Sequence, residues 1–246
     1  MKIYFIGTGS AVATAKRDNT SLYFETDDWN LLVDCPGSII YKFSLLNIDY
    51  TKLQGILITH KHPDHMYGLP SVIHALDPFS IRLPVYASPK IIPDIKKLLD
   101  VFDIADKADL LTLRDFTSKN PAIETFSTKH TPESVGIMIM ENGKKTVYTS
   151  DTGPIPEFKD IAIGSNYLIH DCFAPVSYAD RIPQLEKTHT SAEKLAKMAE
   201  TCKVKNLVPI HFSGEHKFSV DEIKAELEKN YSGNIIIPED LSVLEV

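Results

Sequence analysis

The sequence has few cysteines and no long apolar run. Its three cysteines, Cys35, Cys172 and Cys202, are odd in number, far apart and never in a Cys-x-x-Cys pair. This pattern supports neither a disulfide framework nor a structural zinc knuckle, so we expect buried, reduced thiols in a cytoplasmic protein. No apolar run approaches the ~20 residues that a membrane helix needs, and no membrane association is expected. Gly7-Thr8-Gly9-Ser10 interrupts the apolar N-terminal residues early, which favours a strand and a glycine turn over a signal peptide.

An excess of positive charge is also missing. The chain has 26 Lys and Arg against 33 Asp and Glu, a formal net charge of -7. Contacts to phosphate backbones need Lys and Arg, so bulk charge does not favour a nucleic-acid binder, although a local basic patch would still permit an RNA substrate. The 246 residues are ordinary in composition, with 43% hydrophobic and 24% charged residues. Since no stretch is typical of a linker, we expect one domain over residues 1–246.

Hydrophobic patterns predict an α/β chain in which each half begins with strands and continues with alternating strands and helices. In the first half, strands are predicted over Lys2–Ile6, Thr20–Thr26, Asn30–Val33, Gln54–Thr59 and Val85–Ala87, and helices from Pro36 to about Leu46, over Leu69–Leu76 and over Lys90–Phe102. In the second half, strands are predicted over Ala122–Thr128, Val135–Met140, Lys145–Thr149, Tyr167–His170, Asn206–Pro209, Asn234–Ile237 and Ser242–Glu245, and helices over Ser191–Thr201 and Val220–Asn230. This order suggests two sheets packed face to face with helices outside.

The most informative segment is Thr59-His60-Lys61-His62-Pro63-Asp64-His65, which directly follows a predicted buried strand. Imidazole and carboxylate ligands together suit zinc, manganese or iron. His60 and His62 alternate along the chain, so in an extended loop both can face one ion. Asp64 and His65 follow the Pro63 turn and can address a second ion close by. A structural site would favour cysteine ligands, so the segment indicates a catalytic metal centre.

This segment matches the HxHxDH signature of the metallo-β-lactamase superfamily, and three later motifs resemble that family in order. They are Ser127-Thr128-Lys129-His130, Thr149-Ser150-Asp151 and Pro209-Ile210-His211, each after a predicted strand. The resemblance covers nearly the whole chain and implies a four-layer αββα sandwich with two divalent metal ions. It implies that His60, His62 and His130 bind one ion, that Asp64, His65 and His211 bind the other, and that Asp151 bridges them. Two such ions polarise a substrate oxygen and lower the pKa of bound water to about 7. Zinc is the first expectation, with manganese or iron as alternatives.

Within the superfamily, the chain resembles the branch of ribonuclease Z and related phosphodiesterases. The residues that carry this likeness are Gly7-Thr8-Gly9-Ser10, Arg17-Asp18-Asn19-Thr20-Ser21, Leu32-Val33-Asp34-Cys35-Pro36-Gly37, His170-Asp171-Cys172-Phe173 and Thr188-His189-Thr190-Ser191. Cleavage of a phosphodiester requires a proton for the leaving alkoxide, and a histidine held by a carboxylate supplies one. We therefore predict His189 as general acid, oriented by Asp171, with Asp64 orienting the attacking hydroxide. Asp34 is either a support for the metal ligands or simply structural.

Two departures from ribonuclease Z affect the expected substrate. That family usually carries a long insertion that clamps tRNA between the metal histidine and the bridging aspartate, whereas Asp151 here follows His130 by only 21 positions (151 − 130), room for one hairpin. The motif after His211 continues to Gly214-Glu215-His216, and an acidic residue near a phosphate-facing edge is unfavourable for a polyanion. We therefore expect a small phosphodiester substrate, with a cyclic nucleotide as one hypothesis. His74, His170 and His216 are expected to be structural or surface residues.

Several alternatives stay open at this point. They are a tRNA 3′-processing endonuclease, a lactonase, thioesterase or arylsulfatase, and a non-catalytic metal-binding module. A redox role is not favoured because no flavin-binding domain is attached. Gly68–Ser80 and Ile104–Thr117 are the candidate walls of the site, and a homodimer is the expected assembly by analogy with the related branch and from the frequency of dimers among oligomers.

Overall fold

The structure is a computed structural model that describes residues 1–155, 158–214 and 217–246. It divides into two compact units. Unit 1 comprises Met1–Ala11, Ala15–Asn120 and Glu239–Val246, and unit 2 comprises Val12–Thr14 and Pro121–Pro238. The expectation of one domain over residues 1–246 stays a prediction.

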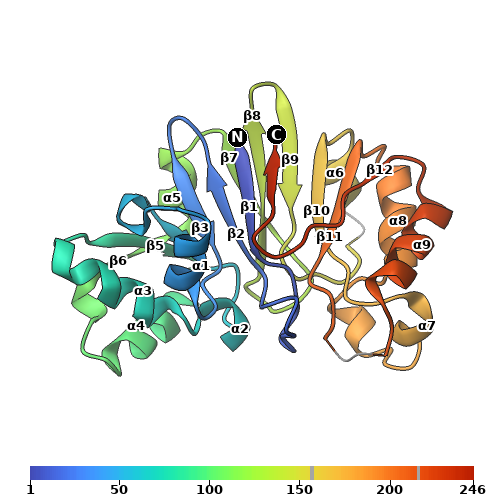
Figure 1. Cartoon of the computed structure of the whole chain (residues 1–246). Coiled ribbons are helices and arrows are strands. Elements are labelled where there is room, and N and C mark those ends of the chain that lie inside the picture. Colours follow the sequence, from blue (N-terminus) through green and yellow to red (C-terminus); the bar gives the residue numbers. More distant parts are fainter. Residues whose placement is uncertain (156–157, 215–216) are drawn as a thin grey trace. The chain divides into compact units, whose positions relative to one another are not determined.

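Unit 1 is built on a seven-stranded mixed sheet with the order β13-β1-β2-β3-β4-β5-β6. The strands are β1 (Lys2–Gly7), β2 (Ser21–Glu25), β3 (Asn30–Val33), β4 (Ile56–Leu57), β5 (Leu83–Ala87), β6 (Ala108–Thr112) and β13 (Val243–Glu245). The pairs from β13 to β3 are antiparallel, and the pairs from β3 to β6 are parallel. Figure 1 shows this sheet in blue to green, with the red strand β13 returning beside β1.

Helices supply much of the core of unit 1. They are α1 (Ile39–Leu45), α2 (Pro63–Met66), α3 (Leu69–Leu76), α4 (Ile92–Asp100) and α5 (Leu113–Lys119), with short 3-10 turns at Tyr50–Lys52, Asp77–Phe79 and Ala105–Lys107. In α3 the buried residues Leu69, Val72, Ile73 and Leu76 recur at the spacing of one helical face. They share one hydrophobic cluster with Phe43 of α1 and with strand residues of the sheet.

Unit 2 is built on a six-stranded sheet with the order β12-β11-β10-β9-β8-β7. The strands are β7 (Ile123–Ser127), β8 (Val135–Glu141), β9 (Lys144–Tyr148), β10 (Tyr167–Asp171), β11 (Asn206–Ile210) and β12 (Asn234–Ile235). As in unit 1, an antiparallel three-stranded meander leads into parallel strands. Asn142 and Gly143 have φ values of 49° and 73°, which is the left-handed pair that a type I′ hairpin turn requires.

The helices of unit 2 are α6 (Phe158–Ala162), α7 (Val176–Ala179), α8 (Ala192–Thr201) and α9 (Val220–Asn230), with a 3-10 turn at Leu185–Lys187. Figure 1 shows α8 and α9 side by side, and their buried residues Leu195, Ala199, Ile223 and Leu227 share one core cluster with Leu168 of β10. Both helices therefore bury an apolar face against this unit's own sheet.

Three local predictions differ from the structure. The first helix begins at Ile39 rather than at Pro36, because Ser38 adopts φ 64° in the left-handed region and interrupts the helical path. The helix predicted over Ser191–Thr201 begins one residue later, at Ala192, because Ser191 is the extended N-cap residue, and its hydroxyl donates to Glu186. No strand or helix was predicted over the candidate wall Ile104–Thr117, but the structure forms β6 and α5 there, and Thr112 ends the strand and caps the helix in a capping box with Asp115.

Parallel strands in each unit bring functional side chains to one edge of that unit's sheet. In unit 1, Asp34 directly follows β3 and His60 lies three residues after β4. In unit 2, Asp151 lies three residues after β9, Asp171 ends β10, and His211 directly follows β11. Because the carboxyl ends of parallel strands meet at the same edge, residues far apart in sequence become neighbours within each unit.

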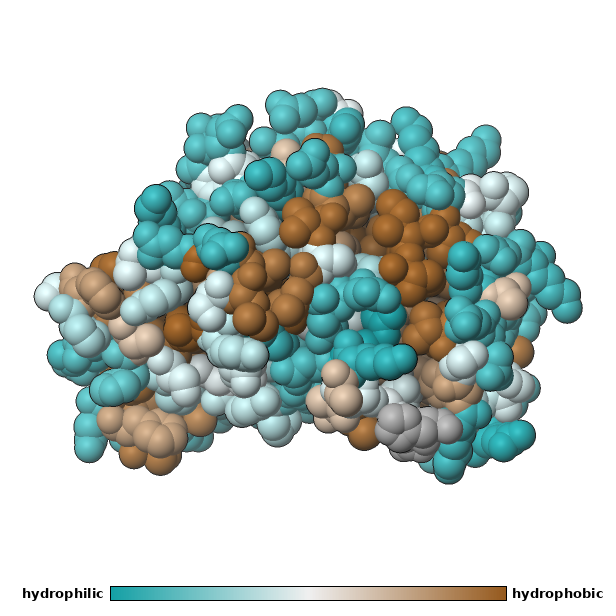
Figure 2. Space-filling model, viewed as in Figure 1, coloured by the Kyte–Doolittle hydropathy of each residue, from teal (hydrophilic) through white to brown (hydrophobic). Residues whose placement is uncertain are grey.

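Exposed hydrophobic side chains are scattered among hydrophilic ones on the part of the surface that the structure describes. On the face shown in Figure 2, hydrophilic residues are interspersed with separate hydrophobic patches. Large exposed hydrophobic side chains are spread over several elements, among them Tyr41 of α1, Val101 after α4 and Met140 of β8. None of the helices among the described residues is both long and apolar enough to cross a bilayer. All three cysteines are free and buried, as predicted.

Candidate metal centre

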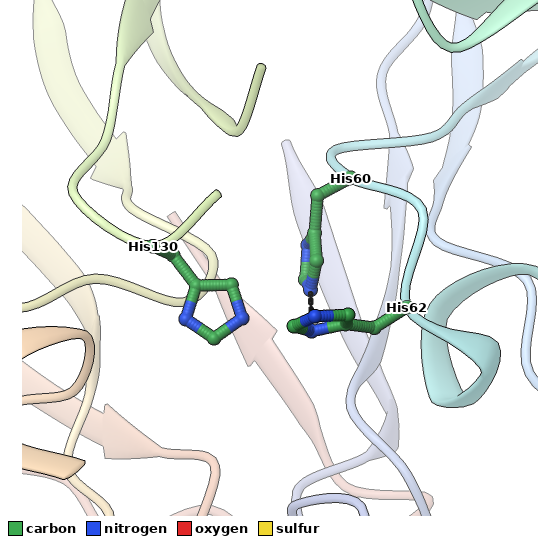
Figure 3. A group of neighbouring side chains, drawn as sticks. All are labelled: His60, His62 and His130. Atoms are coloured by element: carbon green, nitrogen blue, oxygen red, sulfur yellow. Dashed lines mark hydrogen bonds between the residues drawn. The ribbon is translucent and has the colours of Figure 1, made fainter. Parts of the chain in front are cut away.

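The histidine motif of unit 1 lies in the loop between β4 and α2. His60 is fully buried, and Pro63 occupies the first turn of α2, where proline fits because its missing N–H would have no helical partner. His60 Nε2 and His62 Nδ1 are 3.1 Å apart (Figure 3). Two nitrogens bound to one tetrahedral zinc ion at about 2.0–2.1 Å lie about 3.3 Å apart. This pair therefore fits two ligands of a single ion.

The other two residues of the motif also approach each other. His65 Nε2 lies 3.5 Å from Asp64 Oδ2, and the side chain of His65 is fully buried. The second nitrogen of His65, Nδ1, contacts Asp34 Oδ2 at 2.7 Å. A carboxylate accepts, so Nδ1 carries the proton and Nε2 presents its lone pair on the side of Asp64. Asp34 thus orients a predicted metal ligand, in the way that carboxylates commonly hold ligating histidines.

Asp34 is a buried carboxylate that collects several donors. Besides His65, it accepts from the backbone N–H of Thr59 at 2.8 Å and from the Thr59 hydroxyl at 2.8 Å. Burial raises the pKa of Asp34 above its ordinary value, and the contacts with His65 and Thr59 oppose that rise. From the sequence, Asp34 was expected either to support the metal ligands or to be simply structural. These contacts favour support of the metal ligands.

In unit 2, His130 follows β7 and is held by a backbone oxygen. Its Nδ1 lies 3.0 Å from the carbonyl oxygen of Thr188, which only accepts, so Nδ1 carries the proton. Nε2 is then the nitrogen with a lone pair, and it lies 3.6 Å from Asp151 Oδ2. Burial lowers the pKa of His130, although the Asp151 carboxylate opposes this effect. A neutral imidazole that carries its lone pair on Nε2 can bind a metal ion through that nitrogen.

His211 lies between two buried carboxylates of unit 2. Its Nε2 is 3.1 Å from Asp151 Oδ2, and its Nδ1 is 3.5 Å from Asp171 Oδ1. Burial alone would lower the pKa of His211, but the charges of Asp151 and Asp171 outweigh it and raise the pKa to about 10 in the absence of metal. Asp151, the predicted bridging ligand, and His211, a predicted ligand of the second ion, are thus in contact.

Asp171 and His189, the predicted proton-donor pair, are in contact. His189 Nδ1 lies 2.8 Å from Asp171 Oδ2, which also accepts from the backbone N–H of Thr152 at 3.0 Å. The rings of His189 and His211 are stacked, with centroids 5.1 Å apart and planes at 11°. Burial would raise the pKa of Asp171, but His189 and His211 outweigh it and hold that pKa below its ordinary value. Asp171 therefore orients His189 as an ionised acceptor.

The backbone at these strand ends is strained. Asp34, Ser150 and His211 have φ values of 62°, 53° and 64°, in the left-handed region that non-glycine residues rarely adopt. Such residues cost about 1–3 kcal/mol each and persist where the surroundings fix them, often at functional sites. At Asp34 and His211 the backbone therefore leaves the extended conformation directly after β3 and β11.

Of the histidines without a predicted catalytic or metal-binding role, the structure describes His74 and His170. His170 is fully buried, its Nδ1 contacts the carbonyl oxygen of Asp171 at 2.7 Å, and its ring meets Phe158 edge to face. His74 is exposed on α3. Both therefore fit the predicted structural or surface roles. Glu215 and His216 lie outside the described residues. Sequence reasoning missed Thr59 and the Thr188 carbonyl, although Thr59 stood directly before the first metal histidine.

Comparisons with known proteins agree with this arrangement. A family model described as anti-Pycsar protein Apyc1 matches residues 1–227. The ribonuclease Z of Archaeoglobus fulgidus is 24% identical over 305 aligned positions, which cover 100% of this chain and 97% of the relative. Because the alignment is longer than the 246 residues of this chain, the relative contains segments that are missing here.

Two solved structures show the fold. The metallo-β-lactamase fold protein YhfI from Bacillus subtilis has a TM-score of 0.82 and 20% identity, covering 99% of this chain and 98% of that one. A diphosphatase from the PhnP family has a TM-score of 0.75 and 18% identity, covering 100% and 97%. The predicted metallo-β-lactamase fold and the resemblance to the ribonuclease Z branch are confirmed, and the prediction of a metal-dependent hydrolase is borne out at the level of the superfamily.

The raised pKa of His211 predicts how stability depends on pH in the metal-free protein. A folded-state pKa of about 10 against an ordinary 6.5 means that His211 contributes stability in full below pH 6.5 and loses it as pH rises through 10. We expect the free energy of unfolding of the metal-free wild type, relative to His211→Gln, to fall across that window. Urea denaturation of metal-stripped protein at several pH values measures it.

The matched control is His74→Gln, which removes an exposed histidine of α3 and should leave the pH profile unchanged. A wild-type advantage over His211→Gln that stays constant from pH 6.5 to 10 would refute the assignment of the raised pKa to His211.

Proposed function

The chain belongs to the anti-Pycsar protein Apyc1 family, and we propose that it is a hydrolase that uses two divalent metal ions to cleave a small phosphodiester. The observation that carries this proposal is the arrangement of the histidines. His65 and His130 each have Nδ1 bound to an oxygen acceptor, which leaves Nε2 for a metal ion. A set of buried imidazoles with fixed tautomers is costly unless the lone pairs have a ligand.

We assign the ligands as the motif and the family resemblance imply. His60, His62 and His130 would hold one ion, Asp64, His65 and His211 the other, and Asp151 would bridge them. The contacts within each unit support this assignment, because His60 and His62, Asp64 and His65, and Asp151 and His211 each bring ligand atoms within 3.5 Å. Histidine and carboxylate donors favour zinc, with manganese or iron as alternatives.

Bound ions would supply a water-derived nucleophile at neutral pH and offset the charge that develops on the phosphate. Side chains of the protein would orient the attacking oxygen and supply the proton to the leaving group. Asp64 would orient the attacking oxygen through its carboxylate. His189 would protonate the leaving alkoxide, because Asp171 fixes its ring through Nδ1 and leaves Nε2 directed away from that carboxylate. General acid assistance of this kind contributes about 10²- to 10⁴-fold.

The proposal of a small substrate rests on the segment between His130 and Asp151. All of these residues are described, and between them the chain forms only β8, the Asn142-Gly143 turn and β9. No tRNA-clamping arm occurs there. A compact diester, such as a cyclic nucleotide, requires no such arm. The likeness to a diphosphatase is compatible with a phosphorus-containing substrate other than RNA.

The second candidate is a tRNA 3′-processing endonuclease, favoured by the ribonuclease Z relative. No contact among the described residues specifically favours a lactonase, a thioesterase, an arylsulfatase or a non-catalytic metal-binding module. A homodimer and a cytoplasmic location stay predictions, the latter supported by three free buried thiols.

A substrate panel tests the proposed function. Protein stripped with a chelator and reloaded with zinc, manganese or iron is assayed on bis(p-nitrophenyl) phosphate, on 3′,5′-cyclic mononucleotides and on precursor tRNA. We expect metal-dependent turnover of the small diesters and little cleavage of tRNA. Asp64→Asn should abolish turnover, whereas Asp160→Asn, which changes a carboxylate of α6, should not. Fast hydrolysis of a lactone, thioester or aryl sulfate with no diester turnover would reverse the choice.

The proton-donor role of His189 has its own test. His189→Ala should lower kcat by about 10²- to 10⁴-fold when the leaving group is a sugar hydroxyl, because that alkoxide needs a proton. The loss should be much smaller with a p-nitrophenolate leaving group, which departs as a stable anion. Steady-state kinetics on the two substrate types measures the difference. Equal losses on both would assign His189 to binding or folding instead.

A further inference from the structure

Thr59 joins Asp34 to the first histidine of the metal motif. Its hydroxyl oxygen lies 2.8 Å from Asp34 Oδ2 and 3.0 Å from His60 Nδ1. Its backbone N–H donates separately to Asp34 Oδ1 at 2.8 Å. Thr59, Asp34 and His60 are all fully buried. The hydroxyl therefore stands between a carboxylate and an imidazole in surroundings where each hydrogen bond has a large effect.

A hydroxyl has one proton, so only one of its two neighbours can accept from it. If Thr59 donated to His60 Nδ1, its oxygen lone pairs would face the carboxylate oxygen of Asp34 at 2.8 Å, which is repulsive. If it donates to Asp34, it forms a charge-assisted hydrogen bond, which is about twice as strong as a neutral one. The second arrangement is favoured, and the lone pair of the hydroxyl then accepts from His60 Nδ1–H.

A proton on Nδ1 leaves the lone pair of His60 on Nε2. That nitrogen is the one that faces His62 Nδ1 at 3.1 Å, at the separation of two ligands on one ion (Figure 3). The proton arrangement deduced from Asp34 and Thr59 thus agrees with the ligand geometry observed on the opposite side of the ring.

We propose that Thr59 is a positioning residue that sets His60 in the Nδ1–H tautomer and so presents Nε2 to the metal ion. The proposal deepens the proposed function, because it rests on His60 being a metal ligand. Asp34 then controls two histidines of unit 1, His65 by direct contact and His60 through the Thr59 hydroxyl.

The tautomer of His60 in the wild-type metal-free protein tests the proposal directly. At about pH 8.5, two units above the usual histidine pKa, a neutral imidazole shows its protonated nitrogen in ¹⁵N chemical shifts. We expect His60 to be protonated at Nδ1. Protonation at Nε2 in the wild type would overturn the proposal whatever any variant does.

Two substitutions separate the hydroxyl from the rest of the side chain. Thr59→Val has nearly the same shape and keeps the backbone N–H bond to Asp34, whereas Thr59→Ser keeps the hydroxyl. We expect Thr59→Val to shift His60 toward the Nε2–H tautomer and to weaken zinc binding about 10- to 100-fold in competition with a chromophoric chelator. Thr59→Ser should retain the wild-type tautomer and affinity.

The matched control is Thr146→Val. Thr146 is a fully buried residue of β9 whose hydroxyl has no hydrogen-bond partner among the residues that the structure describes. Loss of zinc affinity in Thr59→Val but not in Thr146→Val supports the proposal. Equal affinity of Thr59→Val and wild type overturns it while the proposed function stands, whereas a wild type that binds no zinc contradicts the proposed function itself.

Discussion

The site depends on fixing the orientation and proton position of imidazole rings with oxygen acceptors on rigid backbone. A histidine binds a metal through one nitrogen only if the other holds its proton in a defined place. Here the acceptors are Asp34 for His65 and the Thr188 carbonyl for His130. Asp34 directly follows β3 and His130 lies three residues after β7, whereas His65 lies in α2 and Thr188 directly follows the 3-10 turn Leu185–Lys187. The fold therefore determines the tautomers of these histidines as well as their positions.

In both units, a buried carboxylate at the end of a central strand holds the Nδ1 atom of a histidine. In unit 1, Asp34 accepts from His65 and twice from Thr59. In unit 2, Asp171 accepts from His189 and from the backbone of Thr152. A charge buried in this way is tolerated because several donors compensate its lost hydration. In each unit the carboxylate is followed by a buried cysteine, which packs in the core and leaves the polar edge to the site.

Much of this could be predicted from sequence because the relevant signals are local. Four metal-binding residues within His60–His65 identify the family, and helical spacing locates Leu69–Leu76 without error. What escaped prediction depends on contacts between distant residues. Asp34 and His65 are 31 positions apart, and the Thr188 carbonyl lies 58 positions from His130, so neither partner is visible in a local pattern. β6 was missed because Ala108–Thr112 has little of the β-branched enrichment that marked the other strands.

The proposed two-metal hydrolysis of small diesters rests on the predicted metal ligands and on the segment between His130 and Asp151, which forms a single hairpin. The number of ions bound tests its central claim most directly. After equilibrium dialysis of metal-stripped protein against saturating zinc, elemental analysis should find two zinc ions per chain. Fewer than two ions per chain at saturation would contradict the two-metal account.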